Sequence, residues 1–176
     1  MDMTGEERIA AKREAVWAAL NDVNVLTQCI PGCESLEKTS DTDMVAKVRL
    51  QIGPVRATFN GKVKLSDLEP PSRYRISGEG QGGVAGYAKG GAVVHLIEDG
   101  AGTLLKYEAK ADVGGKLAQL GGRLIDSTAR KLAGEFFQKF GEIVGGGGGN
   151  AAVRAAPMQN VGWFRRLWRR LFGGGR

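Results

Sequence analysis

Residues 115–144 read GKLAQLGGRLIDSTARKLAGEFFQKFGEIV, and this stretch decides the fold that the sequence predicts. Its apolar side chains recur mostly at intervals of three or four, which is the repeat of a helix with one apolar face. Polar residues such as Arg130 fall between them and are expected to face water, and a glycine block from Gly145 ends the run. Gly121 and Gly122 lie inside the predicted helix and weaken it by about 1 kcal/mol each relative to alanine. We therefore predict one long amphipathic helix over 115–144, whose apolar face must pack against another part of the chain.

The residues before this helix are mostly strand-like. Apolar and polar side chains alternate along them, and the pairs Gly53-Pro54 and Pro70-Pro71 mark turns between strands. Alternating strands joined by short turns form an antiparallel sheet with one dry face, which the long helix would cover. The sequence therefore predicts an α+β helix-grip fold, a curved sheet wrapped around a C-terminal helix. The expected order is a strand over 4–11, helices over 12–20 and from Asn21 or Asp22 to Leu26 or Thr27, and strands over 44–52, 55–65, from Tyr74, 87–97 and 105–113.

A curved sheet around one helix often leaves a hollow between them, and small inward-facing residues widen it. Ala57, Gly61, Gly78, Ala109 and Ala111 are such residues by their alternation phase. Alternatively, the glycines only relieve curvature and bulges in the sheet. On the first interpretation, the side chains that share the inward phase line a ligand pocket, namely Phe59, Tyr74, Ile76, Tyr107, Leu120, Gly121 and Leu124.

Three segments carry a resemblance to a known family. They are CIPGCE at 29–34, the strand pair over 48–63 around Gly53-Pro54-Val55, and LEPPSRY at 68–74. Together they resemble CoxG, a family of carbon monoxide dehydrogenase subunits in the START-like or SRPBCC superfamily, and the resemblance covers residues 3–144. The superfamily implies a hydrophobic pocket for a lipid-like or aromatic molecule. The family name implies a link to a molybdenum-containing CO dehydrogenase or a related hydroxylase, often as an accessory that recruits it to a membrane.

Charge is concentrated in the C-terminal part of the chain. The formal net charge is +6, and the six arginines past Glu142, with no acid among them, account for all of it. The preceding part is therefore neutral, which argues against a nucleic-acid surface spread over the domain. The N-terminus is acidic and lacks the apolar core of a signal peptide, and two cysteines give no disulfide framework. The expected location is cytoplasmic.

The C-terminal tail gives the sharpest functional signal. Residues 145–161 are rich in glycine and alanine and predict a flexible linker, whereas 162–176 contain an amphipathic segment. At about 100° per residue, its apolar and cationic side chains fall on opposite halves of a helix. Such a helix is typical of a membrane interface and is too short to span a bilayer. The apolar half is Trp163, Phe164, Leu167, Trp168, Leu171 and Phe172, and the cationic half is Arg165, Arg166, Arg169 and Arg170. Docking on the parent domain or a partner protein, and RNA binding, are the alternatives.

Other motifs give weaker signals. GEGQGG at 78–83 matches the dinucleotide fingerprint in letters, but no helical repeat follows it, as that site requires. Cys29 and Cys33 lack the further ligands of a zinc site and are expected to be packing and turn residues. His95 has no nucleophile motif beside it. The sequence thus predicts no catalytic constellation and no metal.

The sequence as a whole predicts a non-catalytic START-like domain over 1–144 that holds a hydrophobic molecule, with a quinone or a lipid as candidates. Its tail would bind the anionic inner face of the cell membrane as a peripheral anchor. By resemblance, its partner would be a CO-dehydrogenase-type molybdenum hydroxylase, which needs a membrane electron acceptor. The rival interpretation is an enzyme of the same fold acting on a small hydrophobic substrate, and a polar cluster facing the cavity would favour it.

Overall fold

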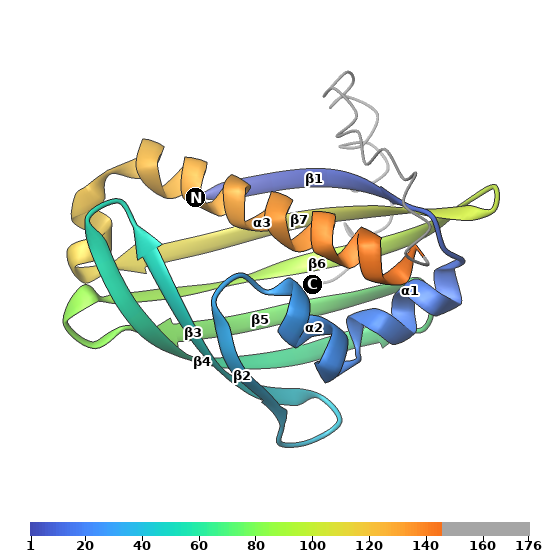
Figure 1. The fold of residues 1–176 in the computed structure, drawn as a ribbon, viewed down its shortest axis with the longest axis horizontal. Coiled ribbons are helices and arrows are strands. Elements are labelled where there is room, and N and C mark those ends of the chain that lie inside the picture. Colours follow the sequence, from blue (N-terminus) through green and yellow to red (C-terminus); the bar gives the residue numbers. More distant parts are fainter. Residues whose placement is uncertain (146–176) are drawn as a thin grey trace, which may run out of the picture.

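The computed structural model describes residues 1–145 of the chain, and Figure 1 shows a long helix lying across a curved sheet. The predicted linker after Gly145 and the amphipathic segment lie outside the described residues. The elements follow in the order β1 (Asp2–Ile9), α1 (Arg13–Leu20), α2 (Val23–Cys29), β2 (Cys33–Lys38), β3 (Asp43–Ile52), β4 (Val55–Glu69), β5 (Arg73–Gln81), η1 (Gly83–Ala85), β6 (Tyr87–Asp99), β7 (Gly102–Gly114), η2 (Gly115–Leu120) and α3 (Gly122–Val144).

The sheet has seven strands in the order β1-β7-β6-β5-β4-β3-β2, and every neighbouring pair is antiparallel. Strands β2 to β7 form a meander, while β1 crosses to the far edge and pairs with β7. The amino group of Met1 extends this pairing by donating to the Ala111 carbonyl at 3.0 Å. The predicted α+β helix-grip fold, with a sheet wrapped around a C-terminal helix, is confirmed.

The register fixes which side chains face the helix. Tyr107 of β7 stacks on Phe137 of α3 with ring centroids 5.4 Å apart, so residues in phase with Tyr107 lie on the helix side. Val94 and Gly5 are its cross-strand partners on β6 and β1. We call this helix side the concave face and the opposite side the convex face. By register, Ala57, Gly61, Gly78, Ala109 and Ala111 lie on the concave face, as predicted.

The predicted helix over 115–144 is wrong in its first part. Residues 115–120 form the 3₁₀ helix η2, and α3 begins only at Gly122. Gly121 separates the two with φ +90°, a left-handed backbone that an α-helix cannot contain. The three-and-four spacing holds on both sides of this break because Leu117 is buried in η2 while α3 starts a new helix. Gly121 is therefore a helix break rather than a weak point inside one helix.

Buried apolar residues form two separate clusters. The main cluster joins α1 and α2 to the sheet and includes Val16, Leu105 and Phe140, which are at most 1% exposed. It also takes in Phe136 and Phe137 from the C-terminal half of α3. The small cluster lies near the β3–β4 turn and η2, around three buried residues, Phe59, Ala85 and Leu117.

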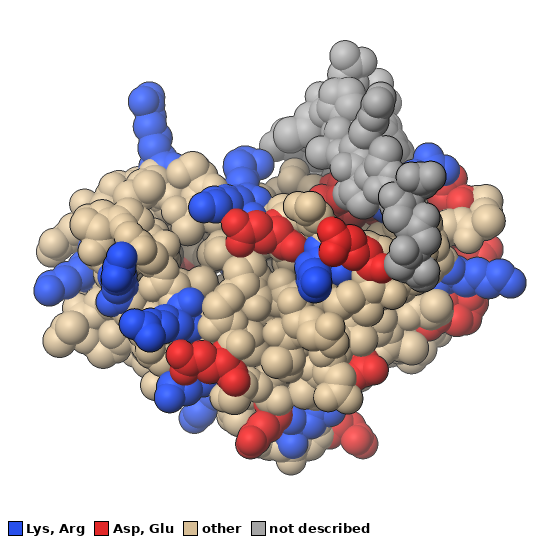
Figure 2. Space-filling model, viewed as in Figure 1, with Lys and Arg blue, Asp and Glu red and all other residues tan. Residues whose placement is uncertain are grey.

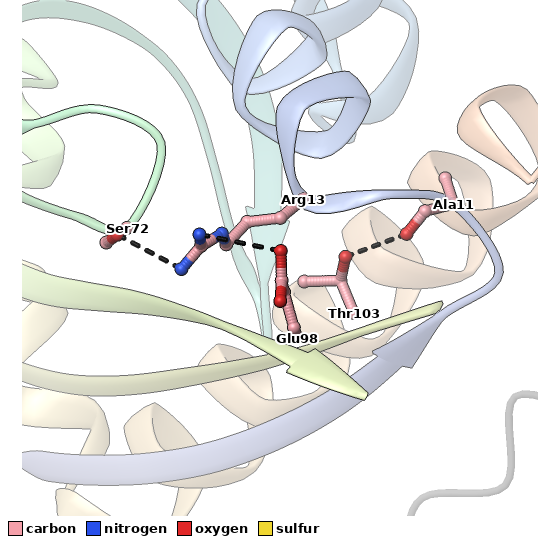
Figure 3. Close-up of polar contacts among 5 residues, drawn as sticks. All are labelled: Ala11, Arg13, Ser72, Glu98 and Thr103. Carbon is pink, nitrogen blue, oxygen red and sulfur yellow. Dashed lines mark hydrogen bonds and ion pairs between the residues drawn. The ribbon is translucent and has the colours of Figure 1, made fainter. Parts of the chain in front are cut away.

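Polar contacts fasten the main-cluster end of the molecule, as Figure 3 shows. Arg13 at the start of α1 donates to the Ser72 hydroxyl at 3.2 Å and pairs with Glu98 at 3.6 Å. The fully buried Thr103 hydroxyl donates to the Ala11 carbonyl at 2.7 Å. These contacts tie the β1–α1 connection to β7 and to the turns at the end of the sheet. This end of the fold is thus closed by polar contacts around the main cluster.

Candidate functional site

The two clusters leave the middle of the concave face between them. Ala92, Ala109 and Ala111 occupy this region and belong to neither cluster. The N-terminal half of α3 lies opposite, and its apolar side chains Leu124, Ile125 and Leu132 also join neither cluster and stay half-buried. Neither group of side chains is packed into one of the two clusters of buried residues. We call this region the central gap.

The surface is open beside this region. Figure 2 shows the molecule hollowed below the N-terminal half of α3, on the side of the β3–β4 hairpin, with cationic side chains around the opening. The closest backbone neighbours of α3 are α2, β1 and η2, which lie around the rim of the concave face. A small molecule entering by this hollow would meet the apolar half of α3 on one side and the alanines of β6 and β7 on the other.

The predicted pocket residues divide between the two clusters and their borders. Tyr74 is buried in the main cluster, with its ring 5.3 Å from that of Trp17, and Ile76 and Tyr107 pack against the same cluster. Phe59 centres the small cluster, and Leu120 packs against it. Leu124 lies in the first turn of α3, and its side chain is next to Gly53 in the β3–β4 turn. Gly121 is exposed, with open space where a side chain would be. The structure therefore places most of these residues around the central gap, and their role in a pocket stays a prediction.

A polar group on the concave face was not found from the sequence. Glu7 of β1 is in phase with Ile9, which is 3% exposed, and so points towards α3. Burial raises the pKa of Glu7. The pKa of Tyr107 is raised by burial and by the charge of Glu7, while Arg130 of α3 acts in the opposite direction. The two-residue spacing from Ile9 was the available signal, because residues two apart on a strand share a face.

The convex face is polar and carries a shallow groove. A groove of about 1150 Å³ is lined by side chains of β3 to β7, among them Lys62, Arg75, Lys89 and Glu108. Of the seven predicted pocket residues, only Ile76 borders it. Its charged lining suits a polar partner better than a hydrophobic molecule, because burying unpaired charges is costly. Most of its lining side chains belong to the convex face, although Ile76, Ala92 and Ala111 of the concave face also border it.

His95 lies on the convex face, away from the central gap. Its register neighbours are Arg73 of β5 and Lys106 of β7, and Lys106 in turn pairs with Glu6 of β1 at 3.3 Å. Burial, with the nearby Arg73 charge, lowers the pKa of His95 from 6.5 to about 4. A histidine held neutral among cations on the opposite side of the sheet cannot reach a molecule bound under α3.

Two other sequence motifs have ordinary structural roles. The glycine-rich stretch that resembles a dinucleotide fingerprint runs along β5 and into the three-residue helix η1, without an α-helix to hold a pyrophosphate. Cys29 is buried at the end of α2 and Cys33 opens β2, and both are free thiols. Burial raises the pKa of each thiol, so neither is an activated nucleophile. In residues 1–145, no three potential metal ligands come together.

Comparisons with known proteins agree with this geometry. The family model for CoxG, which is described as a carbon monoxide dehydrogenase subunit, matches residues 5–145. The chain belongs to the CoxG family. A comparison of this CoxG-family chain with curated protein sequences finds no match.

Solved structures extend the comparison. A conserved protein from Geobacillus kaustophilus is 30% identical to this CoxG-family chain, with a TM-score of 0.78 over 82% of this chain and 95% of that one. Two more distant structures share the fold alone. They are Ara h 8.0201 (10% identity, TM-score 0.59, 82% of this chain and 97% of that one) and the Zhui aromatase/cyclase from Streptomyces sp. R1128 (12%, 0.58, 82% and 93%).

The relatives place this CoxG-family protein among START-like, or SRPBCC, folds. The family is described as a subunit of carbon monoxide dehydrogenase, whereas one fold neighbour is an enzyme, so the fold alone does not decide catalysis. No helix within residues 1–145 is long and apolar enough to cross a membrane. The predicted membrane-binding residues, Trp163 to Phe172, lie outside the described residues.

Proposed function

We propose that this CoxG-family protein is a non-catalytic carrier that holds a lipid or a quinone-like molecule in the central gap. The observation that carries the proposal is that half-buried Leu124, Ile125 and Leu132 of α3 and the alanines in the middle of β6 and β7 all lie outside the two packed clusters. Burying apolar surface stabilises a complex by about 25 cal/mol per Å², so an incompletely filled apolar space favours an apolar occupant. Membership of the CoxG family and the START-like fold support the same role.

The proposal extends to the membrane and to a partner enzyme. The cationic amphipathic segment over 162–176 would hold the protein on the anionic inner face of the cell membrane, where hydrophobic cargo is available. The partner would be a CO-dehydrogenase-type molybdenum hydroxylase, which the family description supports. The flexible linker over 145–161 would let the domain reach this partner while the segment stays on lipid.

An enzyme of the same fold is the second candidate. Glu7 and Tyr107 favour it, because they place polar groups on a face that is otherwise apolar. Against it, neither group is hydrogen-bonded to a second catalytic side chain among the described residues, and His95 lies on the other face. Catalysis by acid and base requires groups within hydrogen-bond reach of the reacting atoms. Recognition of the cargo needs no such set.

The test of the carrier is native mass spectrometry of the full-length protein, followed by extraction and identification of the released molecule. A matched pair of variants locates the site. Ala109→Phe should fill the central gap and abolish the bound mass, whereas Lys110→Phe adds the same ring on the convex face and should leave it unchanged. Gly121 is unsuitable for this purpose because of its exposure and positive φ. Cargo that survives Ala109→Phe in a folded protein would place the site elsewhere.

The membrane part has its own test, which is co-sedimentation of the full-length protein with vesicles containing phosphatidylserine. Changing Arg165, Arg166, Arg169 and Arg170 to Gln should weaken binding about 10³-fold, since each arginine near anionic lipid contributes about 1 kcal/mol. Changing Lys62, Lys64, Lys89 and Lys110 to Gln alters the charge equally on the convex face and should change binding little. Equal losses in the two variants would contradict a specific role for the tail.

A further inference from the structure

Glu7 is the carboxylate on β1 that faces the helix. Its neighbours Glu6 and Arg8 face the convex side and are ion-paired, Glu6 with Lys106 at 3.3 Å and Arg8 with Asp99 at 2.7 Å. The half-buried Glu7 carboxylate has no hydrogen bond or ion pair within residues 1–145. The carboxylate therefore keeps a hydrogen-bonding capacity on the concave face that no described side chain uses.

Tyr107 adds a hydroxyl group next to Glu7. Its ring lies over Gly5, where a side chain of any size would overlap it, and the other side of the ring stacks on Phe137. The ring is thereby held between β1 and α3, with its hydroxyl group over Gly5. Glu7 is the next residue after Gly5 on the same face of β1, so it is a diagonal neighbour of Tyr107 across the strand pair.

Tyr107 stands at the boundary of the central gap, and Glu7 lies on its main-cluster side, opposite Leu105. Tyr107 is the last large inward-facing residue of β7 before Ala109 and Ala111, which belong to neither cluster. On α3, Phe136 belongs to the main cluster, whereas Leu132 one turn earlier does not. A molecule filling the gap would therefore have one end against the Tyr107 ring and the groups at its edge.

We infer that Glu7 and Tyr107 bind the polar end of the cargo, and that this end carries an uncharged hydroxyl group. The inference rests on the proposed function, because it assumes that the central gap holds the apolar part. Glu7 accepts a hydrogen bond from the hydroxyl group, and the Tyr107 hydroxyl donates to its oxygen or accepts from it.

Other end groups fit less well. A carboxylate end would be repelled by Glu7. An amine end would pair with the Glu7 carboxylate but would leave a second positive charge on the side of Arg130, whose charge acts on Tyr107. A plain hydrocarbon end would leave the Glu7 carboxylate dry and unpaired, at the cost of an unsatisfied group. A phenol or an alcohol satisfies both side chains, so the cargo belongs to the class of hydroxyl-bearing hydrophobic molecules.

Equilibrium dialysis of the full-length protein against three matched probes tests the inference. The probes are naphthalene, 2-naphthol and 2-naphthoate, which share one ring system and differ in the end group. A net hydrogen bond contributes about 0.5–1.5 kcal/mol, so 2-naphthol should bind roughly 3- to 10-fold more tightly than naphthalene, and 2-naphthoate should bind most weakly. Naphthalene uptake itself reports on the proposed pocket.

Substitutions then assign the effect to the two side chains. Tyr107→Phe keeps the ring stack, and Glu7→Leu removes the carboxylate. Each should lower 2-naphthol affinity about 3- to 10-fold and leave naphthalene affinity unchanged. Glu7→Gln should bring 2-naphthoate closer to 2-naphthol by removing the repulsion. Glu6→Gln, on the opposite face of the same strand, is the matched control and should change none of the three.

The outcomes separate the two proposals. If naphthalene and 2-naphthol bind equally and Tyr107→Phe has no effect, the polar site is wrong while the apolar pocket stands. If naphthalene is not taken up, or if Ala109→Phe does not reduce its uptake, the pocket itself fails. Tyr107→Phe decides the matter even if Glu7→Leu unfolds the protein, because it removes one oxygen atom and leaves the packing intact.

Discussion

Two leucine-to-alanine substitutions should have very different effects on stability. Leu105 is 1% exposed in the main cluster, whereas Leu132 is half-buried beside the central gap. Truncating a packed core leucine costs about 2–5 kcal/mol, because the transfer of lost methyl groups and the new cavity add together. Leu132 is only half-buried, so Leu132→Ala should lose only part of the transfer energy, about 1 kcal/mol. In a domain of this size the melting temperature should fall by about 10 °C for Leu105→Ala and by about 3 °C for Leu132→Ala.

The assay is urea unfolding of ligand-stripped protein, followed by the same measurement with the extracted cargo restored. Unchanged m-values would show that the unfolding transition stays comparable between variants. With cargo bound, the cost of Leu132→Ala should rise, because the lost side chain then contacts the cargo, whereas the cost of Leu105→Ala should not. Equal losses in the stripped protein would refute the reasoning, since they would mean that α3 is packed onto the sheet along its whole length.

Three further predictions concern the scaffold. Gly32→Ala should destabilise the domain by about 1–3 kcal/mol, because φ is +72° and a side chain there meets backbone, whereas Gly134→Ala in open space on α3 should stabilise it by up to about 1 kcal/mol in thermal unfolding. The free energy of unfolding should fall as the pH is lowered from 6.5 to 4, because His95 takes up a proton in the unfolded state at a higher pH than in the folded state. Urea unfolding of His95→Gln should show a smaller dependence of this free energy on pH across the same range. Thr103→Val should cost about 1–3 kcal/mol in urea unfolding by leaving the buried Ala11 carbonyl unpaired.

The sequence predicted an element well where a single local signal, such as alternation or a capping residue, determines it. Strict alternation identified β3, and the structure extends it by a single residue to Asp43–Ile52. Asp22 was one of the two predicted caps of the second helix, and its carboxylate accepts from the Asn24 amide at 2.9 Å. The break at Gly121 was missed because 3₁₀ and α-helical turns give similar apolar spacing, and glycine supplies the left-handed backbone only when tertiary packing calls for it.

The candidate site was harder to predict than the fold. Phase alone placed Tyr74, Ile76 and Tyr107 on the correct face. It could not show that the buried residues divide into two clusters, because that depends on how α3 packs along the sheet. Glu7 was overlooked because a carboxylate in an acidic N-terminal stretch is usually solvated. Its burial arises from the crossing of β1 to the far edge of the sheet, which no local pattern specifies.

The pairing of β1 with β7 also bears on how the protein is made. Strands β2 to β7 join neighbours in the chain, so their hairpins can form as each turn leaves the ribosome. Strand β1 cannot pair until β7 has been synthesised, because its partner lies about a hundred residues downstream, with Asp2 opposite Lys110. Such a distant contact slows folding, and the nascent chain would carry an unpaired strand and a bare concave face until α3 emerges. We therefore expect this protein to fold only near the end of its synthesis and to depend on chaperones that shield the early strands.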